Sequence, residues 1–555
     1  MKMEESTDII AEILYRSGVK HVVASSGSRS LRMVRAAADN TGFSMHMVVD
    51  ERVAAFSALG ISDCVSQPVA LVCTSGSAML NYAPAIAEAY YRGIPLIAIT
   101  ADRPIDVIDI NDGQTIHQYH ALDNIVKASV DIDATTPCTK EGFDIINRTI
   151  SLSLSPRKGP VHINLHLEEG NDALTYKSIP YDGLPVAPAG LSMPDDTLSS
   201  HIKEIAYNKI LVFLGQMPPD SNMDMIVEQL LACPNVVVIA DIVSNCRAAG
   251  VITDIESIIG KIREESDRYR PQTVITFGKT SPVSRNLKEW LRSIDGYNHW
   301  RINDRQEPED TYHHLERTIV ADAPTFLKSL VDNMPKHDVP SYREIWLDLY
   351  DKAQAVKTSL MTSAQWSDIT AVGMILEHLP ENYNIQCSNG MSIRYMSLTG
   401  VKGHRLYCNR GVNGIDGSTS TALGFSSVAE TPTLLVTGDM SAIYDISALF
   451  SGQLTPKFKM VILANEGGEI FRLTKATRDY ERREQLLCNI PTIKWEDVAK
   501  SVDMDYFEAS NKEELSKIIP SFFSMTGRAS MLVVRTSPGN SETYRNIIKE
   551  IYFSR

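Results

Sequence analysis

Short apolar runs that each end in a Gly, Ser or Asp loop recur along the whole chain. Examples are HVVASSG at 21–27, NVVVIAD at 235–241 and TLLVTGD at 433–439, each followed by a helical pattern. Apolar runs of this length, bounded by such loops, are typical of buried parallel strands. We therefore predict an α/β chain built of three doubly wound parallel sheets.

Two stretches rich in Pro and Gly interrupt this alternation, around 178–196 and 332–341. A chain of 555 residues is also too long for one core, and domains of roughly 150–200 residues suggest three. We place the domains at 1–182, 190–335 and 342–555.

The charge balance excludes some partners. Lys and Arg number 54 against 68 Asp and Glu, a formal net charge of −14, whereas nucleic acids and anionic membranes need basic surfaces. The chain starts on the polar KMEESTD and has no apolar run near the ~18 residues of a membrane span. Its eight cysteines lie scattered without a C-x-x-C pair, as in reduced proteins. We expect a cytoplasmic protein without a membrane span.

Two apolar runs close on oxygen-bearing side chains, Asp439 after the first and Asn465 after the second. The 26 positions between them leave room for a strand, a helix and a return strand. Carboxylate, amide and backbone carbonyl oxygens, the last from Gly467, suit a hard cation that holds a phosphate. Gly438-Asp439 alone would be read as a strand-to-helix turn with Asp as the cap.

Gly438-Asp439-Met440-Ser441 with Asn465 resembles the signature of thiamine-diphosphate (ThDP) enzymes. These enzymes also carry a Glu at the head of an N-terminal helix, and VVDERVAAFSALG offers Glu51 in that place. The resemblance implies that Glu51 bonds the cofactor's pyrimidine ring and favours the tautomer that removes the thiazolium proton. The alternative is a first-turn acid that only complements the helix dipole.

Within the ThDP enzymes, the chain is most similar to the synthases that make 2-succinyl-5-enolpyruvyl-6-hydroxy-3-cyclohexene-1-carboxylate (SEPHCHC) in menaquinone biosynthesis. The resemblance spans nearly the whole chain and is carried by SGSRS at 26–30, TADRP at 100–104, NRGVNGIDG at 409–417 and NEGGEIF at 465–471. It implies a transferase, or carboligase, that decarboxylates 2-oxoglutarate and adds the succinyl unit to isochorismate by 1,4-addition.

The same resemblance implies three domain roles and a set of site residues. The N-terminal domain would bind the pyrimidine and the C-terminal domain the diphosphate and metal, with each cofactor between two chains of a homodimer or dimer of dimers. The metal, Mg²⁺ or Mn²⁺, would be held by Asp439, Asn465 and Gly467. The cofactor would contact Glu51, Ser75, Gly76, Gly414, Ile415, Gly438, Ser441 and Ile470. Catalysis would use Glu51, Gln114 and Arg29. The substrates would contact Ser28, Arg29, Arg103, Gln114, Arg285, Asn389, Arg394, Arg410 and Phe471.

The arginines in this set suit the substrates, since 2-oxoglutarate and isochorismate each carry two carboxylates and guanidinium groups bind carboxylates in bidentate fashion. Each could instead form a surface ion pair. The family usually has Pro at Ser26, Ser at Gly390, and a Lys-Arg pair where this chain reads Ser284-Arg285-Asn286. A divergent paralogue using another 2-oxo acid or acceptor, or a non-catalytic cofactor-binding homologue, therefore stays an alternative.

Overall fold

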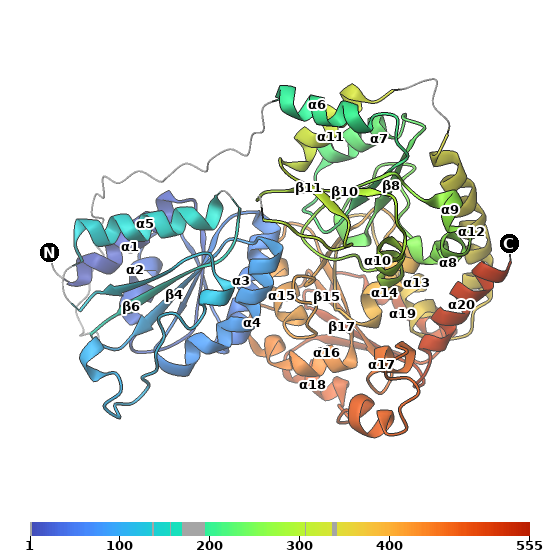
Figure 1. The fold of residues 1–555 in the computed structure, drawn as a ribbon. Coiled ribbons are helices and arrows are strands. Elements are labelled where there is room, and N and C mark those ends of the chain that lie inside the picture. The colour runs from blue at the N-terminus through green and yellow to red at the C-terminus, as the bar shows by residue number, and fades with distance from the viewer. Residues whose placement is uncertain are drawn as a thin grey trace.

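The structure is a computed structural model that describes residues 3–135, 138–155, 157–168, 195–305, 307–335 and 341–554. It contains three parallel sheets with helices on their faces, so the predicted fold class is confirmed. Figure 1 shows the N-terminal sheet in blue beside the C-terminal sheet in orange, with the central sheet in green next to both.

The N-terminal sheet has the order β2-β1-β3-β4-β6-β5. Its strands are β1 (His21–Ala24), β2 (Ser44–Met47), β3 (Val69–Cys73), β4 (Leu96–Asp102), β5 (Ser129–Asp133) and β6 (Val161–His166). Its helices are α1 (Met3–Arg16), α2 (Leu31–Ala38), α3 (Glu51–Val65), α4 (Ala83–Arg92) and α5 (Lys140–Leu154). The inner strands β3, β4 and β6 are buried at every position, which explains why they appear in the sequence as continuous apolar runs.

The central sheet has the order β11-β10-β9-β7-β8. Its strands are β7 (Ile210–Leu214), β8 (Val236–Ala240), β9 (Thr273–Phe277), β10 (Asn298–Asn303) and β11 (Leu315–Val320). Its helices are α6 (Asp195–Ile205), α7 (Ser221–Leu230), α8 (Ile259–Glu264), α9 (Ser266–Tyr269), α10 (Arg285–Ser293) and α11 (Ala323–Asn333).

The C-terminal sheet has the order β13-β12-β14-β15-β17-β16. Its strands are β12 (Asn384–Cys387), β13 (Arg405–Cys408), β14 (Thr433–Gly438), β15 (Phe458–Ala464), β16 (Asp505–Ala509) and β17 (Ser530–Arg535). Its helices are α12 (Arg343–Ser363), α13 (Asp368–Glu377), α14 (Met391–Thr399), α15 (Ser418–Val428), α16 (Asp439–Tyr444), α17 (Glu469–Leu473), α18 (Trp495–Ser501), α19 (Lys512–Phe522) and α20 (Ser541–Phe553).

All three sheets share one winding. Numbered within its own sheet, the strand order is 2-1-3-4-6-5 in the N- and C-terminal sheets and 2-1-3-4-5 in the central sheet. The winding direction therefore reverses between the first and third strand of each sheet. A crevice opens at the carboxyl ends of the strands at such a reversal, and ligands bind there in doubly wound sheets.

The N- and C-terminal domains pack through α3 and α15, which lie side by side in Figure 1. Glycines permit the close approach: a Cβ on Gly60 would lie 1.9 Å from the carbonyl oxygen of Thr421, and one on Gly424 would lie 2.1 Å from that of Ser57. Apolar residues of both domains form one continuous core around these helices. The two domains are thus joined by buried packing.

The predicted domain boundaries stay predictions. Much of the first Pro/Gly-rich stretch and residues 336–340 of the second lie outside the described residues, and α11 ends at Asn333 while α12 begins at Arg343. In the described ranges, no helix combines the length and the apolar character that crossing a membrane would need.

Candidate active site

The predicted site residues gather at the reversal points of the two outer sheets. Ser28 and Arg29 follow β1, and Ser75 and Gly76 follow β3, at the reversal of the N-terminal sheet. In the C-terminal sheet, Asn389 follows β12 and Gly438-Asp439 closes β14. Arg103, Arg410 and Asn465 follow the adjacent strands β4, β13 and β15.

Glu51 is the first residue of α3, and its carboxylate is not used to cap that helix. The preceding Asp50 is the N-cap and accepts hydrogen bonds from the backbone N–H groups of Arg52 and Val53. Asp50 also accepts a bond from the Ser447 hydroxyl at 2.8 Å. Half-buried Glu51 forms no hydrogen bond or ion pair with any residue in the described ranges, so its carboxylate is available to a ligand.

The loop after β3 lies against Gln114. Gly76 has φ +84°, and a Cβ there would lie 3.3 Å from the Gln114 backbone. The Gly76 N–H donates to the buried side chain of Gln118 at 2.7 Å, and Gln118 donates to Asn164 at 2.9 Å. Gln118 therefore positions the Gly76 loop beside Gln114.

The end of β6 holds the two N-terminal arginines of the predicted set. Arg29 donates to the carbonyl of Leu167 at 2.9 Å, and the Arg103 carbonyl accepts a bond from His166. His166 also contacts Asp131 at 3.0 Å. Burial lowers the pKa of His166, but Asp131 and the Arg103 carbonyl outweigh it and raise the pKa overall.

At the C-terminal reversal point, Asp439 is the centre of a buried hydrogen-bond network. Its Oδ2 accepts from the backbone N–H groups of Asn465 at 3.0 Å and Gly467 at 3.1 Å, and its Oδ1 accepts from Met440 N–H at 2.7 Å. Burial raises the pKa of this carboxyl, and the backbone bonds oppose the rise. The Asn465 amide nitrogen donates to Asp368 at 2.8 Å, which leaves the amide oxygen as the group this side chain can offer to a cation.

The third predicted metal ligand, the Gly467 carbonyl, already has a cationic partner. Arg472 donates to it from Nη1 at 2.5 Å and also forms ion pairs with Glu469 at 2.5 Å and Glu484 at 2.7 Å. A metal ion at this carbonyl would compete with one of these bonds. Because two acids still hold Arg472, its guanidinium can yield the carbonyl without becoming unpaired.

The loop 409–417 is fixed on several sides. Asn389 donates to the Gly414 carbonyl at 2.7 Å, and the Ser441 hydroxyl donates to the Ile415 carbonyl at 2.6 Å. Glu88 of α4 accepts from the N–H groups of Gly411 and Val412, both at 2.8 Å. The Ser441 hydroxyl therefore donates its proton to the Ile415 carbonyl and positions that residue. The helix α16 begins at Asp439, which gives this acid its place at the strand-to-helix junction.

Arg394 and Arg410 are cations held mainly by neutral oxygen atoms in the part of the chain that the structure describes. Arg410 is 7% exposed and donates to the side-chain oxygen of Asn389 at 3.2 Å, while half-buried Arg394 donates to the Gly390 carbonyl. Neither guanidinium forms an ion pair with an acid in the described ranges. Burial is the largest cause of a lowered pKa at Arg394, and the nearby Arg410 adds to it against the opposite effect of Tyr544.

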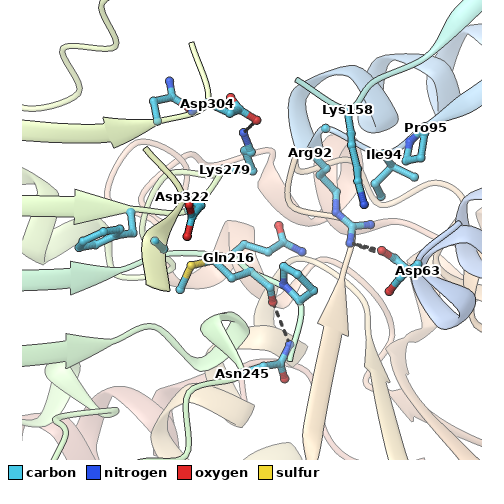
Figure 2. Close-up of a pocket in the computed structure, with 18 of the residues that line it drawn as sticks. Asp63, Arg92, Ile94, Pro95, Lys158, Gln216, Asn245, Lys279, Asp304 and Asp322 are labelled. Atoms are coloured by element: carbon cyan, nitrogen blue, oxygen red, sulfur yellow. Dashed lines mark hydrogen bonds and ion pairs between the residues drawn. The ribbon is translucent and has the colours of Figure 1, made fainter. Parts of the chain in front are cut away.

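Two cavities lie near these residues. One of about 240 Å³ is lined by Arg285 and Arg394, which the structure thereby brings together. A larger one of about 490 Å³ lies at the reversal point of the central sheet, where Figure 2 shows Gln216 and Lys279 with the Asp63–Arg92 ion pair. None of the predicted site residues lines the larger cavity.

The structure leaves the predicted residues in two separate groups. Glu51, Ser75, Gly76 and Gln114 belong to the N-terminal domain, and the metal and diphosphate residues belong to the C-terminal domain. In the part of the chain that the structure describes, no hydrogen bond or ion pair joins a predicted residue of one group to a predicted residue of the other.

Sequence reasoning missed several residues that support the site. Asp368 accepts bonds from Asn465 and from Thr536 at 2.6 Å, and its burial raises its pKa to about 6. Glu88 and Gln118 hold the two loops described above. An acid near a helix start is too common a pattern to have identified Asp368, and nothing local marks the other two.

Comparisons with known proteins agree with this geometry. Residues 5–125 match the family described as thiamine pyrophosphate enzyme, N-terminal TPP binding domain. A protein of Porphyromonas gingivalis, named 2-succinyl-5-enolpyruvyl-6-hydroxy-3-cyclohexene-1-carboxylate synthase, is 33% identical over 553 residues, 96% of this chain and 94% of its own length. Proteins of the same name from Christiangramia forsetii and Flavobacterium johnsoniae are each 33% identical, over 93% and 98% of this chain and 93% and 97% of their own lengths.

Proposed function

We infer the activity of this chain from one premise: it belongs to the family of 2-succinyl-5-enolpyruvyl-6-hydroxy-3-cyclohexene-1-carboxylate (SEPHCHC) synthases. It is a ThDP-dependent transferase that makes SEPHCHC in menaquinone biosynthesis, from 2-oxoglutarate and isochorismate. The predicted family, fold class and activity are thereby confirmed.

One observation in the structure carries the assignment of the substrates. Buried Arg410 and half-buried Arg394 form no direct ion pair with an acid in the described ranges of this acidic protein, and only the more distant Asp241 and Glu256 act on them electrostatically. A desolvated cation costs several kcal/mol unless a counter-ion compensates it. Bound carboxylates would supply that counter-ion, and 2-oxoglutarate and isochorismate carry two each.

We assign the cofactor residues as follows. Glu51 would hold the pyrimidine ring with its available carboxylate, Gly76 would let the backbone approach the ring, and Ile415, fixed by Ser441, would support the cofactor from the C-terminal domain. The cofactor, once bound, supplies an electron sink for the carbon that loses CO₂. Arg29, Arg103 and Gln114 would orient the 2-oxo acid and keep water away from the reacting carbon.

Mg²⁺ or Mn²⁺ at Asp439, Asn465 and Gly467 is part of the same proposal, supported by the oxygen donors that converge there. The residues fit the ion, provided that Arg472 yields the Gly467 carbonyl. Adding ThDP with Mg²⁺ at 100 times its Kd should raise the unfolding free energy by about 2.7 kcal/mol. Asp439→Ala should abolish the rise, measured by thermal melts. An undiminished rise in the variant would place the diphosphate elsewhere.

We further propose a homodimer or a dimer of dimers, supported by the separation of the two residue groups within one chain. A second chain would bring a C-terminal group to each N-terminal group. The cytoplasmic location stays a prediction.

Two product measurements test the substrate assignment. The holoenzyme with ThDP and Mg²⁺ should release CO₂ from 2-oxoglutarate, and with isochorismate it should form SEPHCHC, followed by mass spectrometry. Pyruvate should be a much poorer donor because it lacks the second carboxylate. Equal use of pyruvate, or consumption of 2-oxoglutarate without an isochorismate adduct, would contradict the assignment and favour a divergent paralogue.

A further inference from the structure

The 240 Å³ cavity lies between the central domain and the C-terminal helix α20. Figure 1 shows α20, in red, running past α12 on the side of α8. The cavity is rich in positive charge. Four cations line it: Arg285 of α10, Arg394 of α14, and Arg545 and Lys549 of α20. Glu256 is the acid among the lining residues.

Glu256 forms no direct ion pair with these cations in the described ranges and is held by neutral donors. The Ser284 hydroxyl and the Asn286 amide, the latter at 2.9 Å, both donate to its carboxylate. Burial raises the pKa of Glu256, although those bonds and Arg394 oppose the rise. One carboxyl group against four cations leaves the cavity positive.

Each of the two cations on α20 has a donor group without a hydrogen-bond partner in the described ranges. Arg545 forms an ion pair with Glu542 at 2.7 Å, but its Nε is buried without a hydrogen-bond partner. Lys549 forms no hydrogen bond or ion pair with any residue in the described ranges. The two residues are four positions apart on one helix and therefore share a face. A carboxylate in the cavity could take donors from both.

Among the residues that line the cavity, the central domain supplies a single cation, Arg285. Ser284, the residue before Arg285, accepts the Leu287 N–H with its hydroxyl oxygen as the cap of α10. Arg285 is mostly exposed and paired with Glu289 at 2.6 Å. A ligand with two carboxylates would therefore need cations from another element, and α20 presents them across the same cavity.

We propose that Arg545 and Lys549 bind a carboxylate of the acceptor substrate, so that α20 forms the outer wall of the acceptor site. The inference rests on the proposed function, which names the acceptor as a cyclic dicarboxylate. The reacting carbon of the donor must bond to the cofactor, and none of the proposed cofactor or metal residues lines this cavity, which favours the acceptor as its occupant.

The test compares Arg545→Gln, Lys549→Gln and their double variant with Lys517→Gln. Lys517 is an exposed cation of α19 that does not line the cavity. With saturating 2-oxoglutarate, each cavity variant should raise KM for isochorismate about tenfold, and the double variant should raise it further. KM for 2-oxoglutarate and CO₂ release without acceptor should stay within about twofold of wild type. Arg545→Lys should restore part of the loss, and Lys517→Gln should match wild type.

An unchanged KM for isochorismate in the double variant would overturn the proposal. So would an equal rise in KM for 2-oxoglutarate, since the cations would then act on both substrates alike. Calorimetric titration of isophthalate, a stable cyclic dicarboxylate, distinguishes two failures: that Arg545 and Lys549 bind no carboxylate, and that the acceptor is not isochorismate. Wild type could form no adduct with isochorismate and still bind isophthalate. If the double variant then binds isophthalate at least tenfold more weakly, Arg545 and Lys549 do bind a cyclic dicarboxylate, and only the identification of the acceptor as isochorismate fails. If wild type does not bind isophthalate, or if both proteins bind it equally, Arg545 and Lys549 do not form a dicarboxylate site.

Discussion

At the scale of single residues, two of the three departures from the family pattern, Gly390 and Ser284, have structural reasons. Gly390 has φ +86°, a conformation that favours glycine, and it forms the turn into α14. A Cβ at this position would meet open space. The backbone conformation, and not a lack of room for a side chain, therefore favours glycine here. Ser284 caps α10 and bonds Glu256. Both residues serve local structure, and neither reduces the positive charge contributed by Arg394 and Arg410.

Arg410 allows a direct test of charge recognition. Arg410→Ala should raise KM for 2-oxoglutarate at least tenfold, because losing one partner of a buried charge-assisted pair typically costs ~2–5 kcal/mol. KM for pyruvate as a substitute donor should change little, since pyruvate lacks the second carboxylate. Arg528→Ala removes an exposed arginine paired with Asp503 and Asp505, and it should leave both constants unchanged. Equal rises for the two donors would mean that Arg410 acts on the fold or on the cofactor.

Among the structural elements, α3 and α15 depend on their two glycines. Gly424→Ala should lower the unfolding free energy by about 1–3 kcal/mol, because the new methyl group would meet the Ser57 carbonyl and the helices would have to separate. Gly373→Ala in α13 is the matched control, since its Cβ would meet only the end of the Met361 side chain at 3.1 Å. Denaturant melts should show little loss for the control. Equal losses of stability in the two variants would show that replacing any helical glycine destabilises the protein, and that the close contact between α3 and α15 is not the cause.

The start of α15 is capped by a residue from another element. Asp445 accepts from Ser420 N–H at 2.7 Å and from the Ser420 hydroxyl at 2.8 Å, while the N-cap Gly417 has no side chain. Burial raises the pKa of Asp445 to about 6 from the ordinary 3.8, although the Ser420 bonds and Arg52 oppose the rise. The folded protein therefore binds this proton more tightly than the unfolded chain does.

The Asp445 carboxyl consequently stabilises the fold below about pH 4 and loses this contribution as pH rises through about 6. The difference from the ordinary value corresponds to about 3 kcal/mol. Asp445→Asn keeps the shape and removes the titration. Denaturant melts from pH 4 to 7 should therefore show wild type losing stability relative to the variant by up to that amount. Parallel pH profiles for the two proteins would refute the raised pKa.

The elements also show what the sequence could and could not predict. The strand ends that carry Arg29, Asn389 and Asp439 were predictable, because a buried strand and the loop after it leave a local pattern of apolar and small polar residues. Glu88 was not, since it holds Gly411 and Val412 across more than 320 positions. Such pairings depend on how α4 and the loop 409–417 meet in space, and no local periodicity encodes that.

At the scale of the whole molecule, the N- and C-terminal sheets have the same strand order and are joined through α3 and α15. Each sheet presents the reversal-point residues of half a site, with Glu51 on one and Asp439 on the other. No hydrogen bond or ion pair within the described ranges links Glu51 to Asp439, and in the symmetric dimer proposed above two chains would form two complete sites.

Mixing two inactive variants tests this arrangement. Glu51→Gln chains and Asp439→Ala chains should each be inactive alone, but a hybrid dimer would pair the intact Glu51 of one chain with the intact Asp439 of the other. With random exchange of equal amounts, half of the dimers are hybrids with one intact site in two, so activity should recover to about a quarter of wild type. The double variant mixed with either single variant has no intact pairing and should stay inactive. If each site is formed within one chain, no mixture will recover activity. A fully active monomer in sedimentation would also exclude shared sites, because a single chain would then hold a complete site.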